Sequence, residues 1–389
     1  MPRVPSYFTR EFLALNGIFF LAFCNMAVFF GLYTYLSTLG IDQKWFGLII
    51  GAFSFVSLLV RPFITPFLHP DNARRYMTVG CGMLIAALLS YGFAHTFPGL
   101  LLVRVIHGLG HVLLVTSFTA LIMVFIPQGQ SQNAFGFMMN INLLPYAVVP
   151  PLLGVVMQSP SDFPKVLNWV ALVMVLGFPL LWLARPKKSQ SPEKVTPQRP
   201  GAKAVWRNLK SRPVLILLSI QFYIFLGYAP VFYFIKAFAE QKGLTRAGLF
   251  FSFVALSMVA SRILILPFCD KVGRKKVFAA ALGLLSICLP LLGRVEGQVM
   301  FFGLAVFLGS GWGLASPLIN SIMFELSAPE FKGINTNFLM EMQQAGFFVG
   351  PFLGGLVAAS WGLSLLFHLC GVLTLVGFVS LLFMPKEDI

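Results

Sequence analysis

An acidic side chain within a long apolar segment is the feature of this sequence best suited to proton chemistry. Glu341 is the one acid placed well inside such a segment, and Asn337 and Gln344 lie on the same helical stripe. A lone buried carboxyl either takes up and releases a proton or pairs with a cation. Arg61 and Arg262, in two other apolar segments, could supply that cation. A static structural ion pair is the alternative interpretation of Glu341.

Three basic residues in another apolar segment, Arg104, His107 and His111, follow helical spacing. At ~100° per residue their side chains fall within one arc of about 60°. An arginine in an apolar environment is costly unless it meets a cavity or a partner, and imidazole exchanges protons near neutral pH. The spacing therefore predicts a polar cavity beside this arc. The alternatives are that Arg104 extends to water at the nearby end of its segment and that both histidines are neutral core residues.

Polar and amphipathic side chains within other apolar segments are further candidates for lining such a cavity. They are Asn25, Gln221, Tyr228, Trp312 and Asn320. Lys236 lies near the end of its segment, so we expect its ammonium group to reach water.

The elements that must position these residues follow from composition. The 389 residues are 58% hydrophobic and 11% charged, whereas soluble proteins have roughly 25% charged residues. A soluble domain could not bury so much apolar surface, and a membrane-spanning helix needs about 20 apolar residues. We therefore predict an all-α membrane protein with twelve transmembrane helices. The apolar segments lie at about 12–38, 46–68, 76–95, 99–126, 134–157, 166–184, 213–239, 246–268, 277–293, 298–324, 334–359 and 363–384.

The two halves of the chain repeat at an offset of 201 residues. His107-Gly108-Leu109-Gly110 corresponds to Leu308-Gly309-Ser310-Gly311, and Arg61 corresponds to Arg262. Parallel repeats related by an axis along the membrane normal are typical of transporters that bind substrate at the interface between the repeats. We predict two six-helix bundles, residues 1–184 and 213–389, joined by a flexible, Pro-rich and basic cytoplasmic linker at 185–212.

The distribution of positive charge predicts the orientation. Nineteen Lys and Arg residues lie in the segments on the N-terminal side of the membrane and five in those on the other side. The positive-inside rule places both termini and the linker in the cytoplasm, and we expect a bacterial cytoplasmic (inner) membrane. Topology accounts for the net charge of +15 better than nucleic-acid binding does.

The loop Asp270-Lys-Val-Gly273-Arg274-Lys275-Lys276 resembles the loop signature of the major facilitator superfamily. Arg104 and the following His-Gly-x-Gly resemble the fourth-helix motif of that family. The resemblance implies alternating opening of two bundles, with Asp270, Gly273 and Arg274 as a conformational latch. A second set resembles a glycine motif of drug–proton antiporters, here in the eleventh segment, where it would serve helix packing and bending. Its members are Gly346, Gly350, Pro351, Gly354 and Gly355.

Four basic residues and one acid within the segments favour an anionic ligand, and the many aromatic residues favour an amphipathic one. We expect proton-coupled export of a small organic compound, anionic or amphipathic, by a monomer in the lipid bilayer. Proton-coupled uptake of an organic anion and a non-transporting membrane protein are the alternatives. The sequence has no phosphate loop, HExxH motif, nucleophile elbow or CxxC spacing. We therefore expect no enzymatic activity, metal, cofactor or nucleic-acid partner, and a proton gradient as the energy source.

Overall fold

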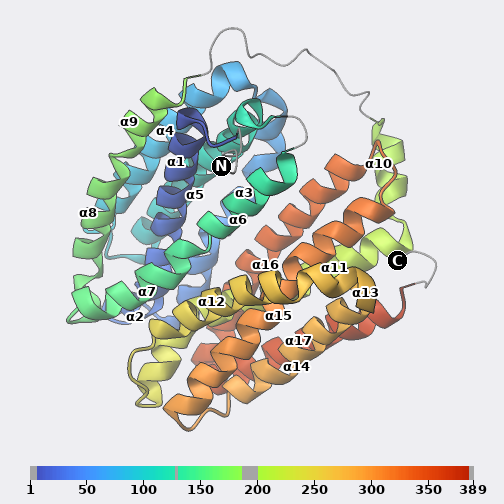
Figure 1. Ribbon diagram of the computed structural model, residues 1–389. Coiled ribbons are helices and arrows are strands. Elements are labelled where there is room, and N and C mark those ends of the chain that lie inside the picture. The colour runs from blue at the N-terminus through green and yellow to red at the C-terminus, as the bar shows by residue number, and fades with distance from the viewer. Residues whose placement is uncertain (1–6, 128–129, 186–199, 385–389) are drawn as a thin grey trace, which may run out of the picture. The chain divides into compact units, whose positions relative to one another are not determined.

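The computed structural model describes residues 7–127, 130–185 and 200–384, except for the side chains of residues 131–133 and 270. The chain folds into two compact units, residues 1–41 with 52–195 and residues 42–51 with 196–389. Within the described ranges each unit consists of helices and connecting turns, with no strand (Figure 1).

The helices follow one another along the chain with short connections. As far as residue 185 they are α1 (Arg10–Ala27), η1 (Val28–Gly31), α2 (Leu32–Leu36), η2 (Gln43–Trp45), α3 (Phe46–Ile64), η3 (Thr65–Phe67), α4 (Pro70–Ser90), α5 (Phe97–Ile122), η4 (Met123–Phe125), α6 (Ser131–Ile141), α7 (Leu144–Val156), η5 (Pro160–Asp162), α8 (Phe163–Met174) and α9 (Gly177–Leu183). From residue 200 they are α10 (Ala202–Leu209), α11 (Arg212–Gln241), α12 (Leu249–Leu264), η7 (Leu266–Phe268), α13 (Cys269–Val272), α14 (Arg274–Leu292), α15 (Gln298–Leu326), α16 (Lys332–Trp361) and α17 (Leu363–Leu382).

All twelve predicted segments are helical, with ends that differ from the prediction by a few residues. Among the described residues, ten helical runs are long and apolar enough to cross a membrane. The other two segments, α4 and α16, have 21 and 30 residues, so at ~1.5 Å per residue they reach the ~30 Å of a bilayer core. These two helices are more polar than those ten runs. The first two turns of α4 carry Asp71, Arg74 and Arg75, and α16 carries Asn335 and Glu341. Composition alone therefore supports ten spans, and length allows twelve.

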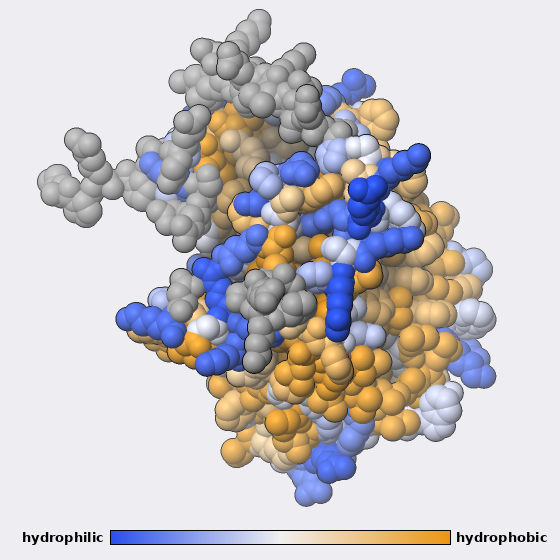
Figure 2. Space-filling model, turned by 90° about the vertical axis from the view of Figure 1, so that its right-hand side faces the viewer, coloured by the Kyte–Doolittle hydropathy of each residue, from blue (hydrophilic) through white to orange (hydrophobic). Residues whose placement is uncertain are grey.

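Large apolar side chains cover much of the surface. Phe63, Phe93, Val155 and Val299 are 73–90% exposed, which would be costly in water. Figure 2 shows broad hydrophobic surface on one face of the molecule, with the hydrophilic residues gathered in patches. Contiguous apolar surface of this extent is expected when lipid is the solvent, in agreement with a multi-pass membrane protein.

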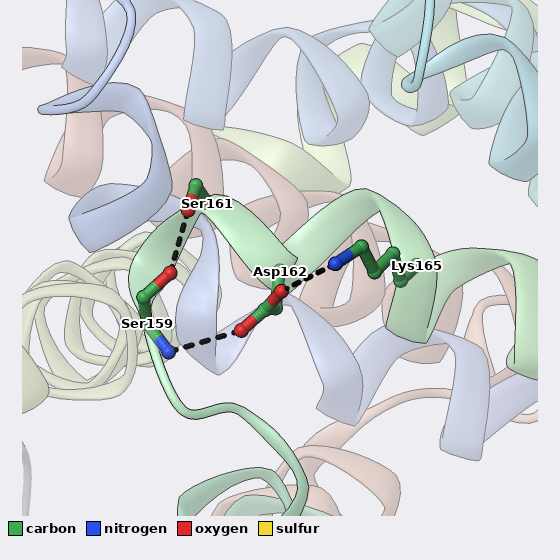
Figure 3. Close-up of polar contacts among 4 residues, drawn as sticks. All are labelled: Ser159, Ser161, Asp162 and Lys165. Carbon is green, nitrogen blue, oxygen red and sulfur yellow. Dashed lines mark hydrogen bonds and ion pairs between the residues drawn. The ribbon is translucent and has the colours of Figure 1, made fainter.

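The start of α8 shows how the ends of the apolar helices are fixed. The backbone N–H of Ser159 donates to Asp162 Oδ2 at 3.1 Å, and Lys165 Nζ donates to Asp162 Oδ1 at 2.9 Å (Figure 3). The carboxylate thus satisfies a backbone donor that the first turn leaves open and lies at the positive end of the helix dipole. This polar cap ends the loop and starts the apolar run at Phe163.

The 201-residue repeat is also a repeat of packing. Gly108 of α5 lies so close to α3 that an added Cβ would come within 2.8 Å of the Phe53 carbonyl oxygen. Gly309 of α15 lies in the same way against the Val254 carbonyl oxygen of α12. Gly108 and Gly309 are 201 residues apart, and so are Phe53 and Val254. In each unit, glycine therefore permits two long helices to cross at backbone contact.

Replacing Gly309 with alanine is expected to lower the free energy of unfolding by about 1–3 kcal/mol, because the new methyl group would overpack this crossing. Gly303→Ala is the matched control on the same helix, since a Cβ there would meet no atom within 4 Å. That substitution should leave stability unchanged or slightly raise it. Thermal unfolding of the purified variants in detergent measures the difference. Equal midpoints for the two variants would contradict this account of the crossing.

The prediction of a flexible linker over 185–212 is wrong for its C-terminal part. Residues 186–199 lie outside the described residues, but Ala202–Leu209 form α10. Asn208 on this helix donates to Asn335 Oδ1 at 2.6 Å, across 127 residues of sequence. A side-chain hydrogen bond to a buried residue of α16 fixes this part of the segment to the second unit.

Candidate functional site

Arg104 occupies an aromatic cage within the first unit. Its side chain is 1% exposed, and its guanidinium carbon lies 4.7 Å from the ring centroid of Phe29 and 5.1 Å from that of Phe53. Its Nη1 donates to the Tyr91 hydroxyl at 3.5 Å. The guanidinium group is therefore held by ring faces and a hydroxyl. The alternative that Arg104 extends to water is wrong.

Tyr91 connects Arg104 to the first of the two histidines. Its hydroxyl lies 3.2 Å from His107 Nδ1. His111 packs against Phe53, with ring centroids 4.9 Å apart. Both imidazoles are buried, and His107 Nε2 and His111 Nδ1 have no hydrogen-bond partner among the described residues. The predicted group of three is brought together, and one ring nitrogen of each histidine, Nε2 of His107 and Nδ1 of His111, remains open to a ligand.

Tyr91 was not predicted from the sequence. It directly follows α4, inside an apolar segment, where a tyrosine is unremarkable. Its role depends on the packing of α4 against α5, which no local spacing reveals. The one available signal was its hydroxyl, since a buried tyrosine O–H usually finds a polar partner.

Asn25 of α1 is a further open polar group in the first unit. It is fully buried, and neither its amide oxygen nor its amide nitrogen has a hydrogen-bond partner among the described residues. A buried amide without partners costs free energy, which a bound polar ligand or water would recover. Its role as a cavity residue stays a prediction. Arg61 lies in the last turn of α3 and is partly exposed.

The second unit holds an aromatic cluster in which α11, α15 and α16 meet. The ring of Tyr228 lies edge-on to Trp312, with centroids 4.7 Å apart, and 5.8 Å from Phe347. Two buried polar atoms of the second unit lack hydrogen-bond partners in the described chain: the indole N–H of Trp312, within this cluster, and Oε1 of Gln221, seven residues before Tyr228 on α11. One is a donor and the other an acceptor. A planar organic molecule with groups of both kinds would satisfy them.

Glu341 lies nine residues after the start of α16 and twenty before its end. Of the acidic residues that the structure describes, it alone lies more than two turns from both ends of its helix. Gln344, one turn further along, is partly buried, and Asn337, one turn earlier, is exposed. The helix places the three residues on one stripe, and their part in a substrate or proton pathway stays a prediction.

Three other predicted polar residues are engaged within the second unit. Arg262 Nε donates to the Gly313 carbonyl oxygen at 3.2 Å, which ties the end of α12 to α15. Asn320 donates to the Ser316 carbonyl oxygen of its own helix at 2.8 Å. Lys236 Nζ lies 4.0 Å from Glu240, so its charge is balanced one turn later. Of these three contacts, only the one between Lys236 and Glu240 offsets a positive charge.

The comparisons with known proteins agree with this architecture. The sequence profile of the Major Facilitator Superfamily matches residues 15–339 and 245–388. The chain belongs to this superfamily. It is 20% identical over 346 residues to the staphylopine export protein of Staphylococcus aureus, covering 87% of this chain and 86% of that protein. It is 25% identical over 216 residues to the quinolone resistance protein NorA of S. aureus, covering 53% and 55%.

The fold likewise matches a solved superfamily transporter. The crystal structure of the nucleoside transporter NupG has a TM-score of 0.79 at 12% identity, with 97% of this chain and 100% of that chain covered. At this identity the likeness concerns the fold alone. Membership of the superfamily implies a small-molecule transporter in the lipid bilayer and not an enzyme.

The superfamily loop adopts a tight turn between α13 and α14. Gly273 has φ +100°, a conformation that favours glycine. Arg274 Nη1 donates to Ser321 Oγ at 3.1 Å and pairs with Glu325, both on α15. The side chain of Asp270 lies outside the described residues. The arginine thus clamps the start of α14 to the end of α15, a contact that a latch would need to make and break.

The glycine row of the superfamily-like motif packs α16 onto its neighbours in the second unit. Gly346 and Gly350 approach α11 at Leu226, and Gly354 approaches Leu366 of α17. Gly355 and Pro351 are also buried, and α16 continues as a helix through the proline. This arrangement leaves the opposite stripe, with Glu341, for other contacts. The predicted division of α16 into a packing face and a polar face agrees with these contacts.

Proposed function

We propose that this chain is a proton-coupled exporter of a small organic compound that is amphipathic or anionic and carries an aromatic ring. Alternating access of the two units would move the compound, and the proton gradient would supply the energy. The observation that carries the proposal is the position of Glu341, an acid far from both ends of a long helix. The staphylopine export protein of S. aureus, which is similar over most of the chain, supports the direction.

A carboxyl group in the middle of a membrane-spanning helix can couple the movement of protons to that of the substrate. In an apolar environment the neutral form is favoured, while a nearby cation favours the charged form. Movement that exposes the carboxyl first to one side and then to the other would let it take up a proton and release it across the membrane. Arg61 and Arg262, each in the last turn of its helix, are candidates for the cation that changes its distance during the cycle.

The chemistry of each unit supports the substrate class. The first unit offers a buried guanidinium group at Arg104 and open nitrogens at His107 and His111. The second offers aromatic rings and two open polar atoms around Trp312 and Gln221. A guanidinium group favours a carboxylate or another anionic acceptor, and aromatic side chains favour a ligand with an aromatic ring.

Uptake of an organic anion is the second candidate function. Arg61, Arg104 and Arg262 outnumber the one deep acid, Glu341, and this balance attracts anions from either side. We further propose that the protein acts as a monomer in a bacterial cytoplasmic membrane, with both termini and the superfamily loop on the cytoplasmic side. The many basic residues of that side support this orientation.

Flux in proteoliposomes tests the proposal. Proteoliposomes that hold the protein with its cytoplasmic face outward, and that are acidic inside, are incubated with anionic, neutral or cationic aromatic compounds. The same incubations are repeated without the pH gradient. We expect gradient-dependent accumulation of an anionic or amphipathic member and none after the gradient is collapsed. Accumulation only under the reverse gradient would instead favour uptake. Accumulation that ignores the gradient would contradict proton coupling.

A further inference from the structure

The short helix α10 has two chemically different faces. Ala204, Val205, Asn208 and Leu209 are partly buried against the second unit. The exposed face carries cations and an aromatic ring at helical spacing. Its members are Lys203, Trp206, Arg207 and Lys210. Trp206 is 61% exposed, and Lys210 Nζ lies 5.0 Å from its ring centroid.

A chain of neutral hydrogen bonds holds the opposite face. Asn208 donates to Asn335 Oδ1 at 2.6 Å, and Asn335 Nδ2 donates to Ser327 Oγ at 2.8 Å. The hydroxyl of Ser327 then donates to the Met323 carbonyl oxygen at 2.6 Å. Asn335 is fully buried. The helix is therefore anchored between α15 and α16 without using any of its cations.

The position of α10 limits what can meet its exposed face. One residue, Ser211, separates Lys210 from the first residue of α11, an apolar helix long enough to cross a membrane (Figure 1). The exposed face consequently lies near the level at which α11 leaves the bilayer. Residues 200–212 contain four basic residues, counting Arg212, and no acid. Cations beside an exposed tryptophan are typical of a helix at the membrane–water interface, where the ring meets the acyl boundary and the cations meet headgroups.

We propose that α10 binds the anionic phospholipid headgroups of the adjacent leaflet through Lys203, Arg207 and Lys210, with Trp206 inserted at the interface. The charge of the face complements phosphodiester headgroups, and juxtamembrane cations draw such lipids to a protein. Because Asn208 connects the helix to the start of α16, bound lipid would also hold α10 against the helix that carries Glu341.

Lipid titration of the full-length protein tests this inference. Purified protein in detergent is titrated with phosphatidylglycerol or phosphatidylcholine, and bound lipid is counted by native mass spectrometry. The variant Lys203→Gln, Arg207→Gln, Lys210→Gln removes the charge from exposed positions, so we expect it to fold. Its phosphatidylglycerol affinity should fall roughly tenfold or more, with phosphatidylcholine binding unchanged. The charge-preserving variant Lys203→Arg, Lys210→Arg should bind like the wild type.

A matched triple variant at other exposed cations, Lys44→Gln, Lys242→Gln and Arg246→Gln, controls for net charge. It should change phosphatidylglycerol affinity less than about twofold, since Lys242 and Arg246 follow the far end of the 30-residue helix α11, roughly 45 Å along the helix from α10 and well beyond a Debye length. The proposal is overturned if the α10 variant binds phosphatidylglycerol like the wild type, or if both triple variants lose affinity equally. In the first case an acidic protein segment would become the better candidate for this face. Neither outcome depends on transport, so the test is independent of the proposed function.

Discussion

Glu341→Gln is expected to abolish accumulation of substrate against its gradient while leaving substrate binding and exchange largely intact. Glutamine has the shape of the protonated acid but cannot release a proton, so the cycle would run without coupling. The accumulation ratio in proteoliposomes should fall to about one under a pH gradient, which is a complete loss of concentrative transport. Counterflow exchange of labelled substrate, which needs only alternating access, should continue.

Glu330→Gln is the matched control for this experiment. Glu330 lies in the exposed turn between α15 and α16, two residues before the helix that carries Glu341. Its substitution removes the same charge close by in the sequence and should leave accumulation unchanged. A Glu341→Gln protein that still accumulates substrate, with the pH dependence of the wild type, would show that coupling lies elsewhere. His107 and His111 would then be the next candidates, since their ring nitrogens are open.

Helix periodicity and residue size made much of the fold predictable. A long apolar run in a bilayer can satisfy its backbone hydrogen bonds within itself by forming a helix. All twelve predicted segments are helical, and among the described residues ten helical runs are long and apolar enough to cross a membrane. The offset of 201 residues predicted a structural repeat, and the close backbone contacts at Gly108 and Gly309 follow that repeat. These features depend on the local sequence, so they can be predicted from a single amino-acid sequence.

Contacts between helices distant in the sequence were not predictable in the same way. The Tyr91 hydroxyl, at the end of α4, contacts both Arg104 and His107 of α5, and the spacing of the apolar segment around Tyr91 does not reveal these contacts. The helix α10 lies in a Pro-rich and basic stretch whose composition predicts a coil, and it is eight residues long. Its anchor, Asn335, is 127 residues away, so its stability comes from tertiary contact and not from propensity.

Substituting Arg104 is expected to lower transport strongly, because its planar guanidinium group fits between two ring faces and reaches a hydroxyl. Arg104→Lys keeps the charge but loses the plane and the forked donors, so we expect a reduction of initial transport rate by about tenfold or more. Tyr91→Phe keeps the ring and removes the hydroxyl between Arg104 and His107, and should give a smaller loss. Arg75→Lys, at an exposed position, is the matched control and should transport like the wild type.

Folding must be separated from function in this series, because a buried cation helps to hold its cage together. Thermal midpoints and size-exclusion profiles in detergent identify the variants that remain folded, and initial rates and substrate affinities are compared only among those. A well-folded Arg104→Lys protein with wild-type rate would show that charge alone suffices and that the ring contacts serve packing. Wild-type transport by a well-folded Arg104→Ala protein would remove Arg104 from the site, and the open nitrogens of His107 and His111 would then need another explanation.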